Sequence, residues 1–526
     1  MLKLLTIFTM YLKGIAYKDY FCPKNQCGMK KILTSQQTKQ LDALTMSAQG
    51  ISSYELMERA VQKLYADMKY YCPDLDRKNF LVVAGPGNNG GDGLGLARMM
   101  REDNVNVSVC FCDFSDKVSP ECQTNIDRYG EDGIMFLSRC ECEIGRLFVP
   151  EDCIVIDAIF GTGLSRSVKG KFADIIGVIN SSLAEVWSID IPSGLFGEDN
   201  SRNNGSIIYA NLTFSIGNRP LSSMFAENYK YFGNVRLVDI GHEMKAAEQM
   251  ESAWYCIEKS DVGDRMKHRQ PFDHKGTFGH ALLLAGGKGK AGAAVMASRA
   301  CLRSGVGLLS ISSVDDICNI MQISVPEAMY MDDWNGDAEK FSAIGIGPGI
   351  GVGGSAMSLV DRALSCRKPM AVDADAINVI AVNRHLVDKL DCCVLTPHPK
   401  EFERLFGKVE NPFERLRGMS DFSQKHKSVV VLKGGITAIS LTDGRIVFYI
   451  GMNPGIATGG SGDVLTGIIT SLLAQGYSVD DAAIVGTWIH GEAGKLASAE
   501  YGVISTVATD IINKIAVVTK QLCNIL

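Results

Sequence analysis

The stretch NPGIATGGSGDVLTG, residues 453–467, decides how we expect the second half of this chain to fold. Four of its five glycines precede Asp463, and the apolar run VLTGIITSLLA that follows predicts a buried helix. A helix that starts after a glycine-rich turn leaves backbone N–H groups unpaired at the positive end of its dipole. Because phosphates and other oxyanions bind at such helix starts, the stretch predicts a phosphate site.

Asp463 is an unusual residue for such a site, because its negative charge would repel a bound phosphate. One interpretation is catalytic: a carboxylate beside an anion site can take the proton of a hydroxyl that is about to attack phosphorus. The other is structural, because Asp often caps the first turn of a helix. The stretch alone leaves both interpretations open.

Length and composition limit the classes of protein to consider. A chain of 526 residues is too long for one ordinary core and predicts about two to four domains. Its 46% hydrophobic and 21% charged residues are typical of a soluble globular protein. A formal net charge of -6 argues against general nucleic-acid binding, which needs a basic face.

The sixteen cysteines do not form a metal-binding pattern. Three pairs are closer in sequence than the CxxC spacing of zinc knuckles and redox sites: Cys110/Cys112, Cys140/Cys142 and Cys392/Cys393. We therefore expect reduced thiols in a cytoplasmic protein without a structural metal.

Residues 1–28 are expected to be an upstream extension without a role in the fold. Their apolar run LLTIFTMYL, residues 4–12, is too short to span a bilayer. A signal peptide is the less favoured alternative, since no small-residue cleavage pattern follows the run. Met29 looks like the more natural start of the folded chain.

The first half of the chain predicts a nucleotide-binding α/β unit. Thr34 and either Ser52 or Ser53 are expected to cap two helices. Residues 80–84 (FLVVA) predict a buried parallel strand, and the glycine-rich loop GPGNNGGDGLGLARMM, residues 85–100, follows it before a helix. This order is typical of nucleotide sites in doubly wound sheets. The loop lacks both a strict GxGxxG pattern and the Lys-Ser/Thr of a P-loop.

Polar residues follow the next strands of this unit. Further strands are expected at residues 105–111, 153–156 and 186–189. Asp157 and Asp190 come directly after the last two of them, and the carboxyl ends of parallel strands lie on one edge of a sheet. Oxygens of Asn89, Asp157 and Ser193 would then surround a hard cation. Taken singly, each of these residues is as readily a loop cap.

A domain boundary is expected near residues 245–255, where the polar stretch GHEMKAAEQMESAW interrupts the strand pattern. Beyond it, short β-rich runs alternate with helices and predict a second α/β unit. These runs are ALLLAG (281–286), AIGIGPGIG (343–351), MAVDADAINVI (370–380), CCVLTPHPKEFERLFG (392–407) and VVVLKGGITAIS (429–440). No Pro/Gly tract separates the two units, so we expect them to be in firm contact.

Taken together, the motifs resemble a known family. The first half, with NNGGDG at residues 88–93, DAIFGTG at 157–163 and DIPSG at 190–194, resembles the NAD(P)H-hydrate epimerases. The second half resembles the NAD(P)H-hydrate dehydratases, a branch of the ribokinase-like fold. Its motifs are HKGTFGH, GPG, DADA, TPHPKE, KGG and NPGIATGGSGDVLTG. Their order and the length of the chain resemble the fused, bifunctional repair enzymes.

The resemblance implies an α/β fold of two three-layer α/β/α domains. Residues 29–248 would form a Rossmann-like domain and residues 249–526 a ribokinase-like domain. It also implies a repair chemistry. Water adds to the nicotinamide ring of NADH or NADPH and leaves a hydrate as R and S epimers, which the first domain would interconvert. The second would phosphorylate the hydroxyl of the S form, and loss of the phosphate would restore the cofactor.

The resemblance also implies the small molecules and partners. ADP is the expected phosphoryl donor and ATP the less favoured one, with AMP and phosphate released. Mg²⁺ would accompany the nucleotide in the second domain, and K⁺ would bind in the first. We expect a cytoplasmic homo-oligomer that binds neither nucleic acid nor membrane.

In the epimerase domain, the resemblance makes Asp190 the candidate for proton transfer. It places K⁺ between Asn89, Asp157 and Ser193. The hydrate would contact Asn88, Asn89, Gly90, Gly91, Asp92, Gly161, Thr162, Gly163, Leu164, Ser165, Arg166, Ser167 and Asp190.

In the dehydratase domain, Asp463 would be the catalytic base, with the backbone N–H groups of residues 460–462 stabilising the transferring phosphoryl group. The hydrate would contact Ala293, Gly349, His398 and Asp463. The nucleotide would contact Lys433, Gly434, Gly435, Ile436, Thr437 and Gly462. Without the resemblance, His398 is as well explained as a loop histidine and Lys433 as a surface charge.

One loop departs from the family. An aromatic residue usually follows the glycine pair there, but this chain has KGKA at residues 288–291. Stacking of this loop on the substrate is therefore in doubt, and Lys288 and Lys290 become candidates for phosphate contacts.

Two other functions are weighed against this one. A ribokinase-like vitamin or sugar kinase with a fused nucleotide-binding regulatory domain would release a stable phosphoester instead of reduced cofactor. A first half that only binds nucleotides is less favoured, because such a module does not need three acids, Asp92, Asp157 and Asp190, beside an anionic ligand.

Overall fold

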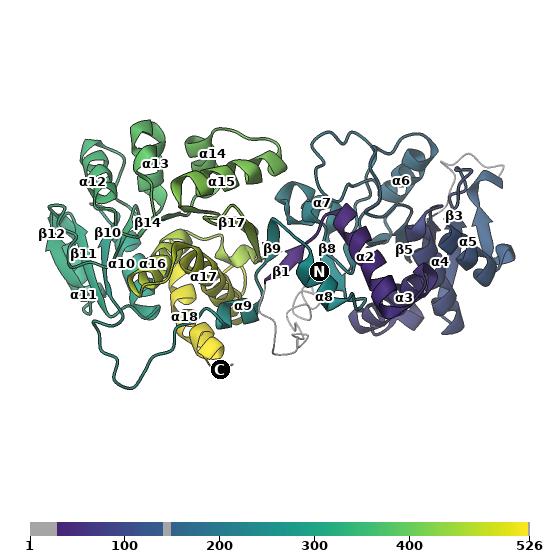
Figure 1. Cartoon of the computed structure of the whole chain (residues 1–526), viewed down its shortest axis with the longest axis horizontal. Helices are drawn as coiled ribbons and strands as arrows, with labels where there is room; N and C mark the ends of the chain where they lie inside the picture. Colours follow the sequence, from purple (N-terminus) through teal and green to yellow (C-terminus); the bar gives the residue numbers. More distant parts are fainter. Residues whose placement is uncertain (1–28, 140–148, 524–526) are drawn as a thin grey trace.

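The structure, a computed structural model, describes residues 29–139 and 149–523. It consists of two α/β lobes that lie side by side, each built around its own sheet (Figure 1). The predictions for residues 1–28 and for Cys140 and Cys142 lie outside the described residues. The cysteines that the structure describes are free thiols, as expected.

The first lobe contains a seven-stranded sheet in which all neighbouring strands are parallel. The strand order is β4-β3-β2-β5-β6-β7-β8. The strands are β2 (Asn79–Ala84), β3 (Asn106–Phe111), β4 (Ile134–Phe136), β5 (Cys153–Ala158), β6 (Glu185–Ile189), β7 (Leu212–Ile216) and β8 (Asn234–Val238). Because the order changes direction between β2 and β5, the segments after these strands meet at one edge of the sheet.

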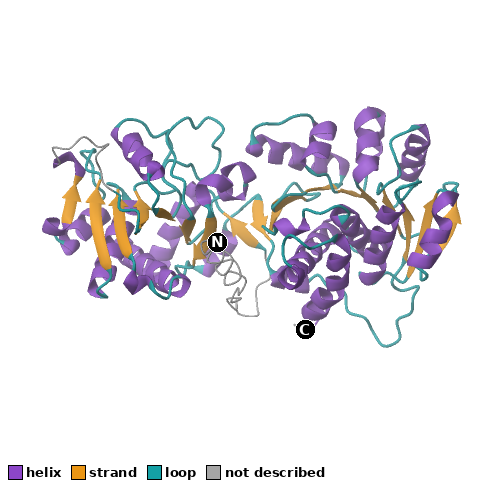
Figure 2. Ribbon diagram, turned by 180° about the vertical axis from the view of Figure 1, so that it is seen from behind, coloured by secondary structure: helices purple, strands orange, loops and turns teal. Residues whose placement is uncertain are grey.

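Helices cover both faces of this sheet (Figure 2). They are α2 (Ser35–Gln49), α3 (Ser53–Tyr71), α4 (Asn88–Glu102), α5 (Pro120–Tyr129), α6 (Lys171–Ser181), α7 (Tyr229–Phe232) and α8 (Met244–Gln249). Short 3₁₀ turns are η1 (Leu75–Arg77), η2 (Glu131–Gly133), η3 (Leu137–Arg139), η5 (Leu221–Met224) and η6 (Ala226–Asn228). Thr34 and Ser52 form capping boxes at the starts of α2 and α3. The two predicted helix starts are confirmed, the second at Ser52.

The predicted glycine-rich loop is mostly helix, which corrects the prediction for residues 85–100. Helix α4 begins at Asn88, so NNGGDG forms its first turns. A Cβ atom at Gly90 would lie 1.7 Å from the carbonyl oxygen of Gly85, and one at Gly93 would lie 2.5 Å from the Cβ of Ala158. The glycines therefore let α4 pack directly on neighbouring backbone and strands, at the usual cost of glycine in a helix.

The second lobe contains an eleven-stranded sheet of order β1-β9-β18-β17-β16-β15-β14-β13-β10-β11-β12. Its strands are β1 (Lys30–Ile32), β9 (Trp254–Cys256), β10 (His280–Leu284), β11 (Leu308–Ser313), β12 (Met329–Asp332), β13 (Ala343–Ile346), β14 (Met370–Val372), β15 (Cys393–Leu395), β16 (Val429–Leu432), β17 (Ile436–Ser440) and β18 (Ile446–Ile450). The run from β16 to β12 is parallel, whereas β17 is antiparallel to both of its neighbours. The parallel run again gathers strand ends at one edge.

Two layers of helices enclose this sheet (Figures 1 and 2). One face carries α10 (Ala291–Arg303), α11 (Cys318–Ser324), α16 (Ser461–Ala474), α17 (Val479–Tyr501) and α18 (Ala508–Cys523). The other carries α12 (Gly354–Ser365), α13 (Ala374–Val382), α14 (Pro399–Phe406) and α15 (Pro412–His426). The remaining short elements are α9 (Lys259–Gly263), η7 (Asp315–Ile317), η8 (Arg384–Lys389) and η9 (Pro454–Ile456). Residues 464–474 of α16 are all buried, which confirms the predicted buried helix.

The two lobes share a strand and an apolar contact. Strand β1 precedes the helices of the first lobe, yet it pairs antiparallel with β9 in the sheet of the second (Figure 1). Phe225 from the first lobe packs in one cluster with Phe402 and Leu416 from the second. Arg415 and Glu227 add an ion pair of 2.5 Å. The expected firm contact is confirmed, whereas the division of the chain at residue 248 stays a prediction.

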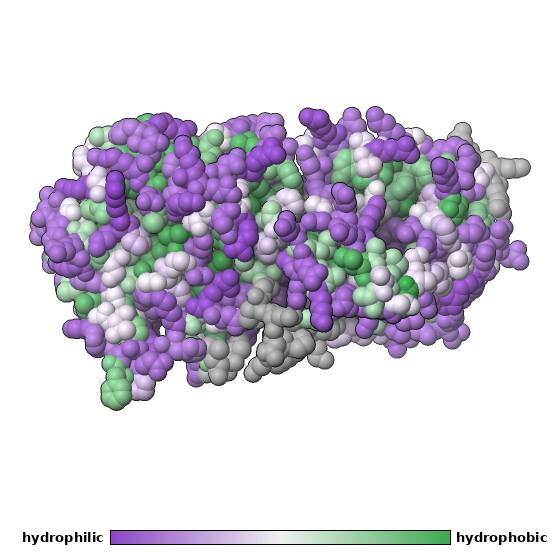
Figure 3. Space-filling model, in the orientation of Figure 1, coloured by the Kyte–Doolittle hydropathy of each residue, from purple (hydrophilic) through white to green (hydrophobic). Residues whose placement is uncertain are grey.

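The surface agrees with the composition. Hydrophilic residues cover most of the face seen in Figure 3, with apolar residues scattered between them. Within the described ranges, no helix is both long and apolar enough to cross a membrane.

Candidate active sites

Asp157 lies at the carboxyl end of β5 and is fully buried. Its carboxylate accepts hydrogen bonds from Ser193 N (2.8 Å), Ser193 Oγ (2.5 Å), Ser188 Oγ (2.8 Å) and Ile159 N (3.3 Å). Burial nevertheless raises the pKa of Asp157. The structure thus brings Asp157 and Ser193 together at the edge where the strand ends meet.

Asp190 follows β6 and has a left-handed backbone conformation, with φ at 67°. Thr162 donates to its Oδ2 from the backbone N at 2.8 Å and from Oγ1 at 2.9 Å. Burial raises the pKa of Asp190, and the nearby charge of Asp42 adds to the rise. Holding a non-glycine residue in this conformation costs about 1–3 kcal/mol, and such residues gather at functional sites.

Asn89 lies in the first turn of α4 and is only 7% exposed. Neither Oδ1 nor Nδ2 of its side chain has a hydrogen-bond partner among the described residues. A Cβ atom at Gly161 would lie 3.4 Å from Cγ of Asn89 and 2.7 Å from Oδ2 of Asp190, so these residues are neighbours. Because a buried amide without a partner is costly, Asn89 is placed for a ligand.

Asp92 adds a third carboxyl group to the same region. Burial raises its pKa well above the ordinary value, and the charges of Asp190 and Asp42 raise it further. Across the described part of the chain, Asp92, Asp157 and Asp190 form no ion pair with a lysine or arginine. A bound cation would offset this excess of buried negative charge.

The other residues predicted to contact the hydrate differ in exposure. Asn88, Gly163, Ser165 and Arg166 are exposed, Gly161, Thr162, Leu164 and Ser167 are half-buried, and Gly90 and Gly91 are buried. A Cβ atom at Gly163 would lie 3.4 Å from Nζ of Lys39, so α2 borders this segment. Residues 161–167 therefore form the rim of the region whose interior holds Asn89 and Asp190.

In the second lobe, Asp463 lies in the first turn of α16, after Gly460 with φ at 88°. No side chain caps the start of this helix. Burial raises the pKa of Asp463 to about 7, with a further rise from Asp373 that Lys433 partly opposes. A capping carboxylate is stabilised in its charged form, so the raised pKa argues against the cap and suits a base that works near neutral pH.

Lys433 follows β16 and donates from Nζ to Oδ1 of Asp373 at 2.9 Å. Thr466 of α16 donates to the other oxygen of Asp373 at 2.8 Å. A Cβ atom at Gly462 would lie 3.3 Å from Lys433 Nζ and 3.4 Å from Asp373 Oδ2. Lys433 and Gly462, both predicted to contact the nucleotide, therefore lie side by side, and Lys433 is not a free surface charge.

The other predicted nucleotide contacts form the turn between β16 and β17. Gly434 and Gly435 connect the strands, and Ile436 and Thr437 begin β17. Thr437 Oγ1 donates to the carbonyl of Gly434 at 3.2 Å. The turn thus continues directly from Lys433 at the edge of the sheet.

His398 caps helix α14. Its Nδ1 accepts from the backbone N of Lys400 (3.1 Å) and Glu401 (3.3 Å), while Glu401 accepts from the backbone N of His398 at 2.9 Å. The cap uses Nδ1, and Nε2 lies 3.4 Å from Oε1 of Glu401, whose charge also contributes to the raised pKa of Asp463. Both ring nitrogens of His398 thus have partners in α14, and its contact with the substrate stays a prediction.

Gly349 and Ala293 are neighbours at the start of α10. A Cβ atom at Gly349, where φ is 72°, would lie 3.2 Å from the Cβ of Lys290 and 3.3 Å from that of Ala293. Lys290 in the departing loop pairs with Asp375 at 3.1 Å, and Lys288 reaches Asp316 at 3.7 Å. Whether these lysines also contact phosphate stays a prediction.

Comparisons with known proteins bear on both lobes. Residues 53–219 match the family model "YjeF-related protein N-terminus" and residues 281–517 match "NAD(P)H-hydrate dehydratase". The bifunctional NAD(P)H-hydrate repair enzyme of Moorella thermoacetica is 30% identical over 514 residues, which cover 93% of this chain and 97% of that protein. The chain belongs to the bifunctional NAD(P)H-hydrate repair enzymes.

Further relatives of this repair enzyme family are similar over comparable lengths. The enzyme from Coxiella burnetii is 31% identical over 501 residues, covering 92% of this chain and 98% of its own. A solved structure, the ADP/ATP-dependent NAD(P)H-hydrate dehydratase of Bacillus subtilis co-crystallised with ATP/Mg²⁺, is 30% identical. The match covers 50% of this chain and 97% of the Bacillus subtilis protein, with a TM-score of 0.44.

The predicted family and fold class are therefore confirmed. This repair enzyme is an isomerase and a lyase, with an epimerase-type domain matched within the first lobe and a dehydratase domain matched within the second.

Sequence reasoning missed several charged residues at both sites of the repair enzyme. Asp42 and Lys39 are in α2, far from any recognised motif, and nothing in the sequence indicates that this helix borders the first site. In the second site the missed residues are Asp373, Asp375 and Glu401. All three stand inside the quoted motifs DADA and TPHPKE, so those motifs could have indicated them.

Proposed function

We propose that the first lobe interconverts the R and S forms of NAD(P)H hydrate and that the second dehydrates the S form. In this proposal ADP, rather than ATP, is the phosphoryl donor, and AMP and phosphate are released. The observation that carries it is Asp463, a carboxyl with a pKa raised to about 7 beside the open start of α16.

In the second lobe, Asp463 takes the proton of the hydrate's hydroxyl as its oxygen attacks the terminal phosphorus of the nucleotide. The N–H groups of residues 460–462 receive the developing negative charge, and Lys433 holds the phosphates. The new C–O–P ester then loses phosphate together with a proton from the ring, which restores the double bond of the cofactor. A base with a pKa near the working pH is well matched to the first step.

Mg²⁺ fits the carboxylates around Asp463. It prefers oxygen ligands and usually binds through one or two carboxylates together with the phosphates of a nucleotide. The charges of Asp373 and Asp375 both raise the pKa of Asp463, so these carboxylates lie near the proposed phosphate position. Asp375 would hold the ion through Oδ1, because Lys290 and Gly351 N occupy only its Oδ2, whereas Lys433 and Thr466 occupy both oxygens of Asp373. The ion would neutralise phosphate charge during transfer.

K⁺ fits the first site through Asn89, Asp157 and Ser193. The support is the buried, unpartnered amide of Asn89 and the excess of buried carboxylates. An oxygen set of amide, carboxylate and hydroxyl suits a hard cation. The ion would fix the segment around Asn89. It would also lower the free-energy cost of burying Asp92 and Asp190 in their charged forms.

Asp190 is the proposed proton-transfer residue of the epimerase. Burial and its strained backbone both indicate a side chain that the fold holds in one position. Thr162 donates twice to Oδ2 and so holds the carboxylate beside the proposed substrate position. Asn88, Asp92 and residues 161–167 would line the ring and the ribose around it.

The test follows the absorbance band of reduced nicotinamide. Purified protein is mixed with NADH hydrate, Mg²⁺ and K⁺, and with ADP or ATP in parallel. Both epimers of the hydrate are expected to be converted fully to reduced cofactor, faster with ADP than with ATP, with one inorganic phosphate released per cofactor. Conversion of the S form alone would contradict the epimerase activity. Absence of conversion with either nucleotide would contradict the whole proposal. A stable phosphoester instead of reduced cofactor would favour the vitamin or sugar kinase.

We also propose a cytoplasmic homo-oligomer. The free thiols support a reducing compartment, and sedimentation of the purified protein would test the oligomer.

A further inference from the structure

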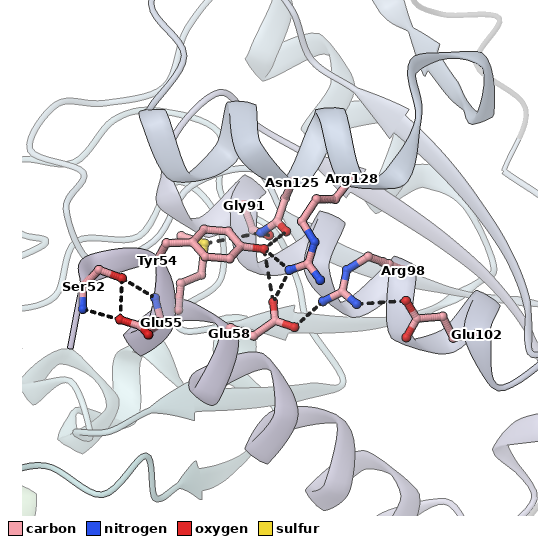
Figure 4. A network of polar contacts seen from close by, with 10 residues as sticks. Ser52, Tyr54, Glu55, Glu58, Gly91, Arg98, Glu102, Asn125 and Arg128 are labelled. Carbon is pink, nitrogen blue, oxygen red and sulfur yellow. Dashed lines mark hydrogen bonds and ion pairs between the residues drawn. The ribbon is translucent and has the colours of Figure 1, made fainter.

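A polar network connects α3, α4 and α5 behind the first site (Figure 4). Glu58 of α3 accepts from Arg98 of α4 at 2.5 Å and from Arg128 of α5 at 3.3 Å. Arg98 also donates to Glu102 at 2.9 Å. With two arginines and two glutamates, the network adds no net charge behind an already acidic site.

The network ends at Asn125 of α5, which is 1% exposed. Tyr54 OH accepts from Arg128 and donates to Oδ1 of Asn125 at 3.0 Å (Figure 4). The same hydroxyl lies 3.3 Å from Oε2 of Glu58. The backbone carbonyl of Gly91 fixes which way the amide of Asn125 faces, because a carbonyl oxygen only accepts. Nδ2 then donates to the backbone carbonyl of Gly91 at 2.9 Å.

Gly91 stands between Asn89 and Asp92 in the first turns of α4. It has no side chain that could anchor this turn, and a Cβ there would lie only 2.9 Å from Sδ of Met57. Gly91 N donates to the carbonyl of Gly87 at 3.1 Å, and the bond from Asn125 adds a directional side-chain contact to the backbone next to Asn89. Asn89 itself makes no side-chain hydrogen bond within the described residues, so its position depends on the turn that carries it.

We propose that Asn125 is a positioning residue, which holds the first turn of α4 so that the amide of Asn89 faces the cation. The inference rests on the K⁺ site of the proposed function. Residues that orient metal ligands by hydrogen bonds typically change affinity by about 10–100-fold when they are removed.

The experiment compares wild type, Asn125→Ala and Asn180→Ala by thermal unfolding. KCl replaces choline chloride at constant ionic strength, and the midpoint of the K⁺-induced rise in Tm is measured, together with the K⁺ dependence of epimerisation. Asn180 of α6 is the control: its Nδ2 donates to the carbonyl of Ile207 at 2.9 Å, as Asn125 donates to that of Gly91, and its Oδ1 accepts from Tyr209 N at 2.9 Å.

Asn125→Ala is expected to raise the K⁺ midpoint at least about 10-fold in both measurements, with the epimerisation rate at saturating K⁺ within about 2-fold of wild type. Asn180→Ala should lower Tm without moving the midpoint. Tyr54→Phe, which removes the hydroxyl that holds Oδ1 of Asn125, should shift the midpoint by an intermediate amount and serves if Asn125→Ala does not fold.

An unchanged midpoint in Asn125→Ala, or in Tyr54→Phe if only that variant folds, would overturn the positioning role and leave the proposed K⁺ site standing. A wild type without a K⁺-selective rise in Tm would overturn the K⁺ site, and the inference with it.

Discussion

Lys433 Nζ lies 2.9 Å from Oδ1 of Asp373, and this ion pair stands beside Gly462, the residue before Asp463. The pair joins the turn after β16 to the start of α16 through Thr466, which binds the second oxygen of Asp373. The two charges act in opposite directions on the pKa of Asp463, which Asp373 raises and Lys433 lowers. The ion pair therefore affects the pKa of the proposed base, Asp463, and lies at the proposed phosphate position.

Asp373→Asn should shift the pH profile of dehydration. Removing the charge of Asp373 takes away a contribution that raises the pKa of Asp463, and it frees Lys433 to lower that pKa further. The rate-pH midpoint should therefore fall, by about 1 unit as an order of magnitude. Dehydration of the S hydrate at saturating nucleotide would be measured from pH 5 to 9, about the range in which such a group titrates.

The epimerisation profile of the Asp373→Asn variant is the internal control and should not move. An upward shift of the dehydration midpoint would contradict the assignment of Asp463 as the titrating base.

Asp463→Asn should abolish dehydration and leave epimerisation intact. Loss of a general base costs about 10²–10⁴ in rate. Cofactor recovery would be followed with the S hydrate, and exchange between the epimers would be followed separately. Normal recovery in this variant would remove Asp463 from the mechanism.

The same substitution should change stability with pH. Because the folded-state pKa of Asp463, about 7, lies above the unfolded value of 3.8, ionisation favours the unfolded state as pH rises between these values. Asp463→Asn should thus be more stable than wild type at pH 8, on the order of 2 kcal/mol, and equal to it near pH 3. Thermal unfolding at the two pH values would check this, and a destabilised variant at pH 8 would contradict it.

Asn89→Ala should remove the K⁺ dependence of epimerisation at little cost in stability. Its amide has no hydrogen-bond partner to lose among the described residues, so truncation leaves no donor or acceptor newly unpaired. Tm in choline chloride should stay close to wild type, and the K⁺-induced rise in Tm should disappear. A large loss of Tm without K⁺ would show that Asn89 is a structural residue.

Gly90→Ala should destabilise the first lobe by about 3 kcal/mol or more, because its Cβ would lie 1.7 Å from the backbone oxygen of Gly85. Gly87→Ala is the matched control, since no atom lies within 4 Å of a Cβ at that position. Denaturant unfolding of both variants would measure the difference. Equal stability of the two would contradict the close packing of α4.

The candidate sites could be predicted only in part. Asp157 and Asp190 were readable because each directly follows an apolar run, and parallel strands gather their ends at one edge. The helical start of α4 could not be predicted, because NNGGDG has low helix propensity and becomes helical only where backbone and strands pack against it. The role of Asp42 could not be predicted either, because its approach to Asp92 and Asp190 is a contact between distant parts of the chain.

The sequence by itself determined the local features of this repair enzyme: the helix caps at Thr34 and at Ser52 or Ser53, the alternation of strands and helices, and the buried helix after Gly460. Each depends on residues within a few positions of one another, and sequence records such spacing directly. Only the tertiary structure decided that β1 joins the sheet of the second lobe and that Asp373 stands beside Asp463. These depend on long-range packing and on burial, which set both the neighbours of a carboxylate and its pKa.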